Sequence, residues 1–255
     1  MICWVAERAL ATRNVTRAIV ATDDQRIVDA VESAGFEAVL TSAQHQSGTD
    51  RIAEVAAAIA GAEIIVNLQG DEPLISPETI ERAVAMMQAE ITRESNRTDH
   101  GVGIVTTWEP IDSAADVVNP DVVKIVVDEN ENAVYFSRSP IPYPREAVRT
   151  HGGFEAALAN EPGLLAKFRK HTGLYVYRRE VLLAFSQWPQ SELERTESLE
   201  QLRALERGVR IKAIQATASS IGVDTFADLQ RVREIVSSSE FQVSSSKHLL
   251  RQLES

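Results

Sequence analysis

The feature that most constrains the fold is an alternation of short apolar runs with amphipathic helical patterns in the first ninety residues. Apolar runs bounded by turn residues predict buried strands, and they lie at 17–22, 36–40 and 64–68. Apolar residues at helical spacing, with polar capping residues in front, predict helices at 24–34, 50–60 and 77–90. Strands and helices that alternate in this way predict a mostly parallel sheet with helices on both faces.

Beyond residue 100 the pattern changes, because predicted strands follow one another more closely. We expect strands at 102–107, 122–127, 133–137, 171–177 and 211–216. We expect helices at 192–206 and 225–236, and a hairpin turn at 128–132. The stretch 138–170 carries several prolines and is interpreted as irregular.

The two ends of the chain differ from a simple doubly wound sheet. The sequence opens in an amphipathic helix, whereas the first strand of such a sheet is usually central and carries the phosphate-binding turn. No glycine-rich phosphate loop is found anywhere in the sequence. At the other end, the Ser-rich segment 237–246 predicts a frayed tail. We therefore expect one α/β domain over 1–236 and a polar tail over 237–255.

Composition excludes several classes of protein. Lys and Arg number 26 against 37 Asp and Glu, and the formal net charge of −11 disfavours binding to nucleic acid or an anionic membrane. The single cysteine, Cys3, excludes an internal disulfide and a cysteine-cluster zinc site. No apolar run reaches the roughly 18 residues of a membrane-spanning helix. We expect a cytoplasmic globular protein with no nucleic-acid partner and no membrane partner.

The first segment with chemical potential is Gln-Gly-Asp-Glu-Pro at 69–73, directly after the predicted strand 64–68. Open α/β sheets bind ligands beyond the carboxyl ends of their strands, so Asp71 is expected at the mouth of a cleft. A carboxylate there can hold Mg²⁺, which prefers oxygen ligands and shares them with phosphates. Gly70 would let the backbone approach a ligand closely. The alternative is an ordinary turn.

A second segment, His-Gln-Ser-Gly-Thr-Asp-Arg at 45–51, offers hydroxyls, backbone amides and a guanidinium. Such a loop can hydrogen-bond a ribose or a base edge. The alternative is a helix start, with Thr49 or Asp50 as the capping residue. Both interpretations can hold together, because a helix N-terminus already presents free N–H donors.

Asp224 follows the predicted strand 211–216 and precedes a predicted helix. The functional interpretation makes it a second metal ligand opposite Asp71, because two acidic residues at the ends of different strands can clamp Mg²⁺ on a triphosphate. The alternative is that Asp224 or Thr225 only caps the helix.

A fourth group of polar residues lies in the second half of the sequence. His171 and Tyr175 are four residues apart on a predicted strand and therefore share a face. Arg138 follows another predicted strand, and Glu200 lies in the predicted helix 192–206. Taken singly, each of these residues is more often packed or paired than a ligand.

Together, the order and spacing of these segments resemble the family of 3-deoxy-manno-octulosonate cytidylyltransferases. The resemblance covers roughly residues 1–235 and rests on IVATDD, HQSGTDR, QGDEP, YFSRSPIPY, HTGLYVYRREVL and GVDTFADL. It implies the nucleotide-diphospho-sugar transferase fold, which is Rossmann-like, with a mixed sheet and a smaller lobe. It also implies a homodimer that pairs through this lobe, at about 130–185.

The resemblance further implies a reaction in which CTP and 3-deoxy-manno-octulosonate (Kdo) give CMP-Kdo and pyrophosphate for lipopolysaccharide assembly. The implied ligands of Mg²⁺, and the catalytic residues, are Asp71 and Asp224. The residues implied to hold the sugar acid are Gln69, Arg138, His171, Tyr175 and Glu200. The residues implied to face the nucleotide are Ser47, Gly48, Thr49 and Arg51.

One departure from the family pattern concerns the N-terminus. Family members begin with a strand and a loop close to IPARYxSTRLPGKPL, whose arginine and lysine bind the CTP phosphates, and Met1 aligns just past that loop. Either the start codon is assigned too late, or the chain is a true truncation that lacks the first central strand and is inactive. Two further alternatives stay open: a cytidylyltransferase for another acidic sugar, such as 8-amino-Kdo or a sialic acid, and a non-catalytic remnant.

Overall fold

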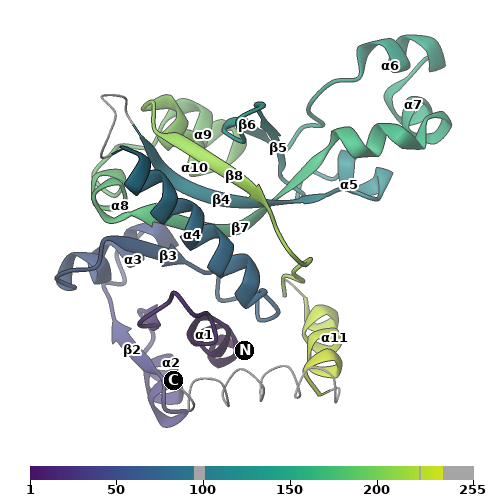
Figure 1. Ribbon diagram of the computed structural model, residues 1–255. Coiled ribbons are helices and arrows are strands. Elements are labelled where there is room, and N and C mark those ends of the chain that lie inside the picture. Colours follow the sequence, from purple (N-terminus) through teal and green to yellow (C-terminus); the bar gives the residue numbers. More distant parts are fainter. Residues whose placement is uncertain (95–100, 224, 238–255) are drawn as a thin grey trace. The chain divides into compact units, whose positions relative to one another are not determined.

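The computed structural model describes residues 1–94, 101–223 and 225–237, and Figure 1 shows its helices and strands. The chain forms two compact units. The first unit comprises Met1–Ala85 and Thr217–Ser255, and the second comprises Met86–Ala216. Within the described residues, no helix combines the length and the apolar character that crossing a membrane requires.

The first unit contains the predicted alternation of strands and helices. β1 (Ile19–Thr22) and β2 (Glu37–Leu40) pair in parallel, with Ile19 opposite Glu37. The other elements of this unit are α1 (Ile2–Leu10), α2 (Gln25–Ser33), α3 (Gly48–Ala58), β3 (Ile64–Asn67), the first part of α4 (Pro77–Glu94) and α11 (Phe226–Ser237). A parallel pair needs a crossover connection, and α2 supplies it.

The helix α2 begins and packs as its sequence predicts. The Asp24 carboxylate accepts a hydrogen bond from a backbone N–H of the first turn and caps the helix. Gly35 follows the helix with a φ of +84°, a conformation that glycine adopts without strain. The apolar face of α2 buries Val31 against Ala6 of α1 and Val20 of β1. This small core fixes both helices beside β1.

The second unit is a mixed sheet with the strand order β6-β5-β7-β4-β8. The strands are β4 (Val102–Pro110), β5 (Lys124–Val127), β6 (Ala133–Ser137), β7 (Arg169–Arg178) and β8 (Arg210–Gln215). β4 pairs in parallel with β8 and antiparallel with β7. Nearly every residue of β4 is buried, as expected for a strand covered on both faces. The α/β class and the mixed sheet predicted from the sequence are confirmed.

The predicted hairpin turn between β5 and β6 is also confirmed. The Asp128 carboxylate accepts hydrogen bonds from the backbone N–H groups of Asn130 and Asn132, each at 2.8 Å. Glu131 adopts a φ of +62°, which completes the reversal of the chain.

The interpretation of 138–170 as irregular is wrong. This stretch forms α6 (Arg145–His151), α7 (Phe154–Asn160) and a 3₁₀ helix (Pro162–Lys167), and Figure 1 shows α6 and α7 away from the strands of the second unit. The prolines precede or begin these helices, where a missing N–H costs nothing. Leu158 and Phe168 pack with Ile111 and Val117 in a core of their own. This core supplies the stability that such short helices lack by themselves.

The prediction of one helix over 192–206 is wrong as well. The segment forms α9 (Glu192–Glu197) and α10 (Gln201–Glu206), because Ser198 adopts the left-handed conformation with a φ of +53° and ends α9. Two further helices were not predicted: α5 (Ala114–Val118) and α8 (Arg179–Phe185). Both span fewer than two turns, too few for a repeating helical pattern of apolar residues to stand out in the sequence. The predicted tail at 237–255 lies, after its first residue, outside the described residues.

Candidate active site

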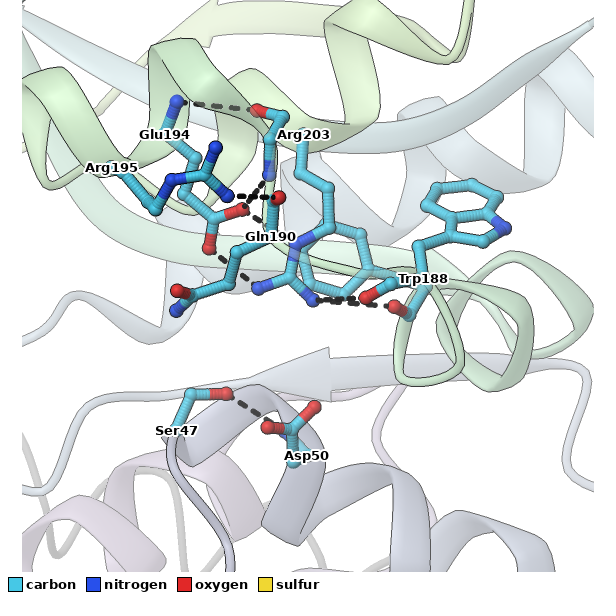
Figure 2. A network of polar contacts seen from close by, with 9 residues as sticks. Ser47, Asp50, Trp188, Gln190, Glu194, Arg195 and Arg203 are labelled. Atoms are coloured by element: carbon cyan, nitrogen blue, oxygen red, sulfur yellow. Dashed lines mark hydrogen bonds and ion pairs between the residues drawn. The ribbon is translucent and has the colours of Figure 1, made fainter.

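The nucleotide-side residues predicted from the sequence lie at the start of α3. The Ser47 hydroxyl accepts a hydrogen bond from the Asp50 backbone N–H at 3.2 Å, so Ser47 is the N-cap (Figure 2). The expectation that Thr49 or Asp50 caps this helix is wrong, since both belong to its first turn. Thr49 is buried there, whereas Gly48 is exposed. Gly48 is the exposed residue of this helix start, a position that suits an anionic or polar ligand.

Arg51 is held at the carboxyl ends of β1 and β2. Its guanidinium forms an ion pair with Asp23 at 3.1 Å and donates a hydrogen bond to the Thr41 hydroxyl at 2.5 Å. Asp23 directly follows β1, and Thr41 directly follows β2. These contacts fix the cation at the sheet edge where open α/β sheets bind their ligands.

A contact between the loop 42–45 and Glu54 of α3 was not predicted from the sequence. The Glu54 carboxylate forms a hydrogen bond with the His45 ring and accepts another from the Ser42 backbone N–H at 3.1 Å. The hydrogen bond with His45 is the main reason that the pKa of Glu54 lies below its ordinary value. The pair fastens the loop 42–45 to α3, and no sequence pattern indicates it.

The predicted metal ligand Asp71 is exposed in the loop that follows β3. Its backbone carbonyl accepts a hydrogen bond from the Val223 N–H at 2.8 Å. Val223 directly precedes Asp224, which itself lies outside the described residues. In the same loop, a Cβ on Gly70 would come within 3.3 Å of the Ile2 side chain, so α1 leaves little room for a larger residue. The loop that carries Asp71 is thus hydrogen-bonded to Val223, the last described residue before Asp224 in the sequence.

The described residues contain no group of three or more His, Cys, Asp or Glu side chains that could hold a metal by itself. Such a group is not needed for Mg²⁺, which is commonly bound through one or two carboxylates with waters and substrate phosphates. The exposed carboxylate of Asp71 is a suitable ligand of this kind.

Three of the predicted sugar-side residues lie close together in the second unit. The rings of His171 and Tyr175, both on β7, have centroids 5.3 Å apart, and Phe136 of β6 packs edge-on against His171 at 5.0 Å. Burial is the main reason that the pKa of the Tyr175 hydroxyl is raised, and the charges of Tyr177 and Glu200 raise it further. The carboxylate of Glu200 is therefore near this aromatic pair. The expectation from strand alternation that His171 and Tyr175 share a face holds in the structure.

Arg138 has several partners within its own unit. Its Nε donates to the backbone carbonyl of Glu197 at 2.7 Å, and its two Nη atoms donate to carbonyls of Pro120 and Ser198 at 2.9 and 3.3 Å. The Glu197 carboxylate in turn accepts from the Arg138 backbone N–H at 2.9 Å. Arg138 thus fastens the end of β6 to the turn that leads to Glu200, and its role toward a substrate carboxylate stays a prediction. Gln69, the fifth predicted sugar-side residue, is half-buried in the first unit.

Burial of His171 predicts a pH dependence of stability. Burial lowers the pKa of its ring to about 3, whereas an unfolded histidine has a pKa near 6.5. Between these two pKa values the unfolded chain binds a proton on this ring and the folded chain does not. The free energy of unfolding therefore decreases as the pH falls from about 6.5 to 3. We expect the free energy of unfolding of His171→Gln to fall less over this window, in urea titrations at several pH values. The same pH dependence in both proteins would contradict this assignment.

Comparison with known proteins identifies the family. The family model for cytidylyltransferases matches residues 1–211. The 3-deoxy-manno-octulosonate cytidylyltransferase of Trichlorobacter lovleyi is 44% identical over 92% of this chain and 87% of its own length. The enzyme of that name from Escherichia coli is 42% identical over 92% of this chain and 85% of its own. A solved CMP:2-keto-3-deoxy-manno-octonic acid synthetase complexed with CTP is 40% identical, with a TM-score of 0.77, over 92% of this chain and 86% of that one.

A mixed α/β fold, a cation at the ends of parallel strands and the matching family model define the class as a cytidylyltransferase. The resemblance stated from the sequence motifs is confirmed by the similarity over nine-tenths of the chain. The chain belongs to the family of 3-deoxy-manno-octulosonate cytidylyltransferases.

Proposed function

We propose that this chain transfers CMP from CTP to the anomeric hydroxyl of Kdo and releases pyrophosphate. The observation that carries the proposal is its likeness to the synthetase complexed with CTP, at 40% identity over 92% of this chain. Relatives named for the same reaction, with similar identity over most of their length, support it. The proposed location is the cytoplasm, where CTP is made and used.

The proposed chemistry is an in-line displacement at the α-phosphorus of CTP. The anomeric oxygen of Kdo forms the new bond to phosphorus and its proton passes to solvent water, while the bond between the α-phosphorus and the bridging oxygen of the β-phosphate breaks and pyrophosphate leaves. Such phosphoryl transfers depend mainly on positioning and charge neutralisation. We assign nucleotide binding to Ser47, Gly48, Thr49 and Arg51. We assign binding of the sugar acid to Gln69, Arg138, His171, Tyr175 and Glu200.

We further propose that the reaction uses Mg²⁺, with Asp71 and Asp224 as its protein ligands. When bound, the ion would neutralise charge on the phosphate oxygens. The exposed carboxylate of Asp71 after β3 supports this assignment. So does the hydrogen bond that brings Val223, the neighbour of Asp224, to the Asp71 backbone.

The test is product analysis with the purified full chain, CTP, Mg²⁺ and one sugar acid at a time. We expect pyrophosphate release with Kdo, and CMP-Kdo as the product identified by phosphorus NMR. Assays with 8-amino-Kdo and a sialic acid decide which acidic sugar is preferred, and ATP and UTP serve as nucleotide controls. If another sugar acid were turned over faster, that acid would replace Kdo as the proposed substrate. The absence of product with every sugar acid would favour a non-catalytic remnant.

We also propose that the chain forms a homodimer through a lobe at about 130–185. The lobe carries exposed apolar side chains, with Val134 58% and Tyr143 60% exposed. Burial of such side chains against a second copy would be favourable. The molar mass in solution, measured by light scattering, tests the proposal: a value near 28.1 kDa at all concentrations would reject it.

A further inference from the structure

The sugar-side cluster contains a buried hydroxyl that the sequence analysis did not single out. Thr106, in the middle of β4, has a side chain with no exposed surface. Its Oγ1 lies 2.9 Å from Nε2 of His171 and donates a hydrogen bond to the carbonyl oxygen of Leu174 at 2.8 Å. One hydroxyl therefore joins the ring of a predicted substrate-binding residue to the backbone of the same strand.

An irregularity in the strand pairing creates this arrangement. Thr106 is paired with Tyr175, but the next residue, Thr107, is paired with Thr172. Gly173 and Leu174 thus have no residues opposite them on β4, and the ladder of backbone hydrogen bonds is interrupted there. The Leu174 carbonyl is satisfied by the Thr106 hydroxyl instead, as a buried carbonyl requires.

The hydrogen atoms available for these two contacts determine which nitrogen of the His171 ring is protonated. The Thr106 hydroxyl has one hydrogen, and the Leu174 carbonyl can only accept, so that hydrogen goes to Leu174. The contact between Oγ1 and Nε2 is then a hydrogen bond only if Nε2 carries a proton and donates it. Burial lowers the pKa of the ring to about 3, so the ring is neutral at physiological pH. A neutral ring protonated on Nε2 has an unprotonated Nδ1, which is an acceptor.

We propose that Thr106 is a positioning residue that fixes the Nε2-protonated tautomer of His171, so that Nδ1 accepts a hydrogen bond from a hydroxyl of the sugar acid. The proposal rests on the proposed function, since it assigns the sugar acid as the ligand of His171. An unprotonated Nδ1 attracts a hydroxyl but repels a carboxylate, which has only lone pairs to offer. His171 thus orients the sugar with a hydroxyl, and not the acid group, toward β7.

Within the part of the chain that the structure describes, the hydrogen bond found for the ring goes to Thr106 alone. The ring is held on its other sides by aromatic contacts, with Phe136 edge-on and Tyr175 tilted against it. As a whole residue, His171 is half-buried.

Two variants of Thr106 and one matched control separate this role from general support of the sheet. Thr106→Val keeps the shape and removes the hydroxyl, and Thr106→Ser restores it. Thr107→Val is the control, because Thr107 is equally buried on the same strand and its hydroxyl bonds the Thr172 hydroxyl instead of His171.

The first measurement is the tautomer itself, from nitrogen NMR of full-length protein labelled with ¹⁵N-histidine, with His171→Gln to assign the signal. We expect Nε2 protonated in the unsubstituted protein, in Thr106→Ser and in Thr107→Val, and a mixture of tautomers in Thr106→Val. A proton on Nδ1 in the unsubstituted protein would overturn the proposal, even if Thr106→Val did not fold. An unchanged tautomer in folded Thr106→Val would overturn it too.

The second measurement is kinetic. We expect Thr106→Val to raise the KM for Kdo about tenfold, the effect of one lost hydrogen bond, while the KM for CTP stays unchanged. Thr106→Ser should restore the original KM, and Thr107→Val should leave it unaltered. If the KM for Kdo rose equally in Thr106→Val and Thr107→Val, the role of Thr106 would be merely structural. Lack of any product from the unsubstituted protein would reject the proposed function, whereas the NMR result decides the role of Thr106 independently.

Discussion

Asp71→Asn is expected to lower the rate of CMP-Kdo formation by more than about 100-fold. Loss of a residue that only supports a metal ligand typically costs 10- to 100-fold, and a direct ligand should cost more. Asn keeps the size of the side chain but removes the negative charge that would hold Mg²⁺. Pyrophosphate release at saturating CTP and Kdo, over a range of Mg²⁺ concentrations, measures the effect.

Stability is not expected to change in this variant, because Asp71 is exposed and the hydrogen bond from Val223 goes to its backbone carbonyl. Glu63→Gln is the matched control. It removes a carboxylate that is also exposed and lies next to the same strand, but before β3 instead of after it. Activity should be retained in Glu63→Gln. If Asp71→Asn retained activity with Mg²⁺, Asp71 would have no part in metal binding.

Most strands and helices of this chain could be predicted because their signals are local. The Asp24 cap and the Gly35 stop bound α2 within a window of a dozen residues. Where the prediction failed, the deciding interaction was distant or confined to one residue. The left-handed conformation of Ser198 splits a helical pattern that is otherwise continuous. The short helix α7 depends on Phe168 and Val117, which lie outside it in the sequence.

In the candidate site, too, local patterns could be predicted and distant contacts could not. Strand alternation was enough to place His171 and Tyr175 on one face. The partners that set their chemistry could not be found in this way. Thr106 meets His171 across 65 positions of sequence, and Glu197 meets Arg138 across 59. A single threonine in an apolar strand resembles any other buried residue until the register with β7 is known.

Glu194→Gln is expected to reduce the free energy of unfolding by about 3–5 kcal/mol, because it leaves a buried cation unpaired. Glu194 of α9 and Arg203 of α10 both have side chains that are only 4% exposed. The guanidinium donates from Nε and Nη2 to the two carboxylate oxygens at 2.7 and 2.5 Å, as Figure 2 shows. It also donates to the Trp188 carbonyl at 3.2 Å and lies 4.5 Å from the ring centre of Phe185.

Glutamine removes the negative charge of Glu194 but keeps the other role of this side chain. Glu194 also closes a capping box with Ser191 at the start of α9, and Gln can make the same hydrogen bond. The matched control is Glu146→Gln, which removes the partner of Arg149 in an ion pair that is 75% and 73% exposed and is expected to contribute far less. Urea denaturation of the three proteins measures the difference. If Glu194→Gln lost no more stability than Glu146→Gln, the guanidinium would be held by the carbonyls and the aromatic ring, and the carboxylate would not be needed to keep α9 against α10.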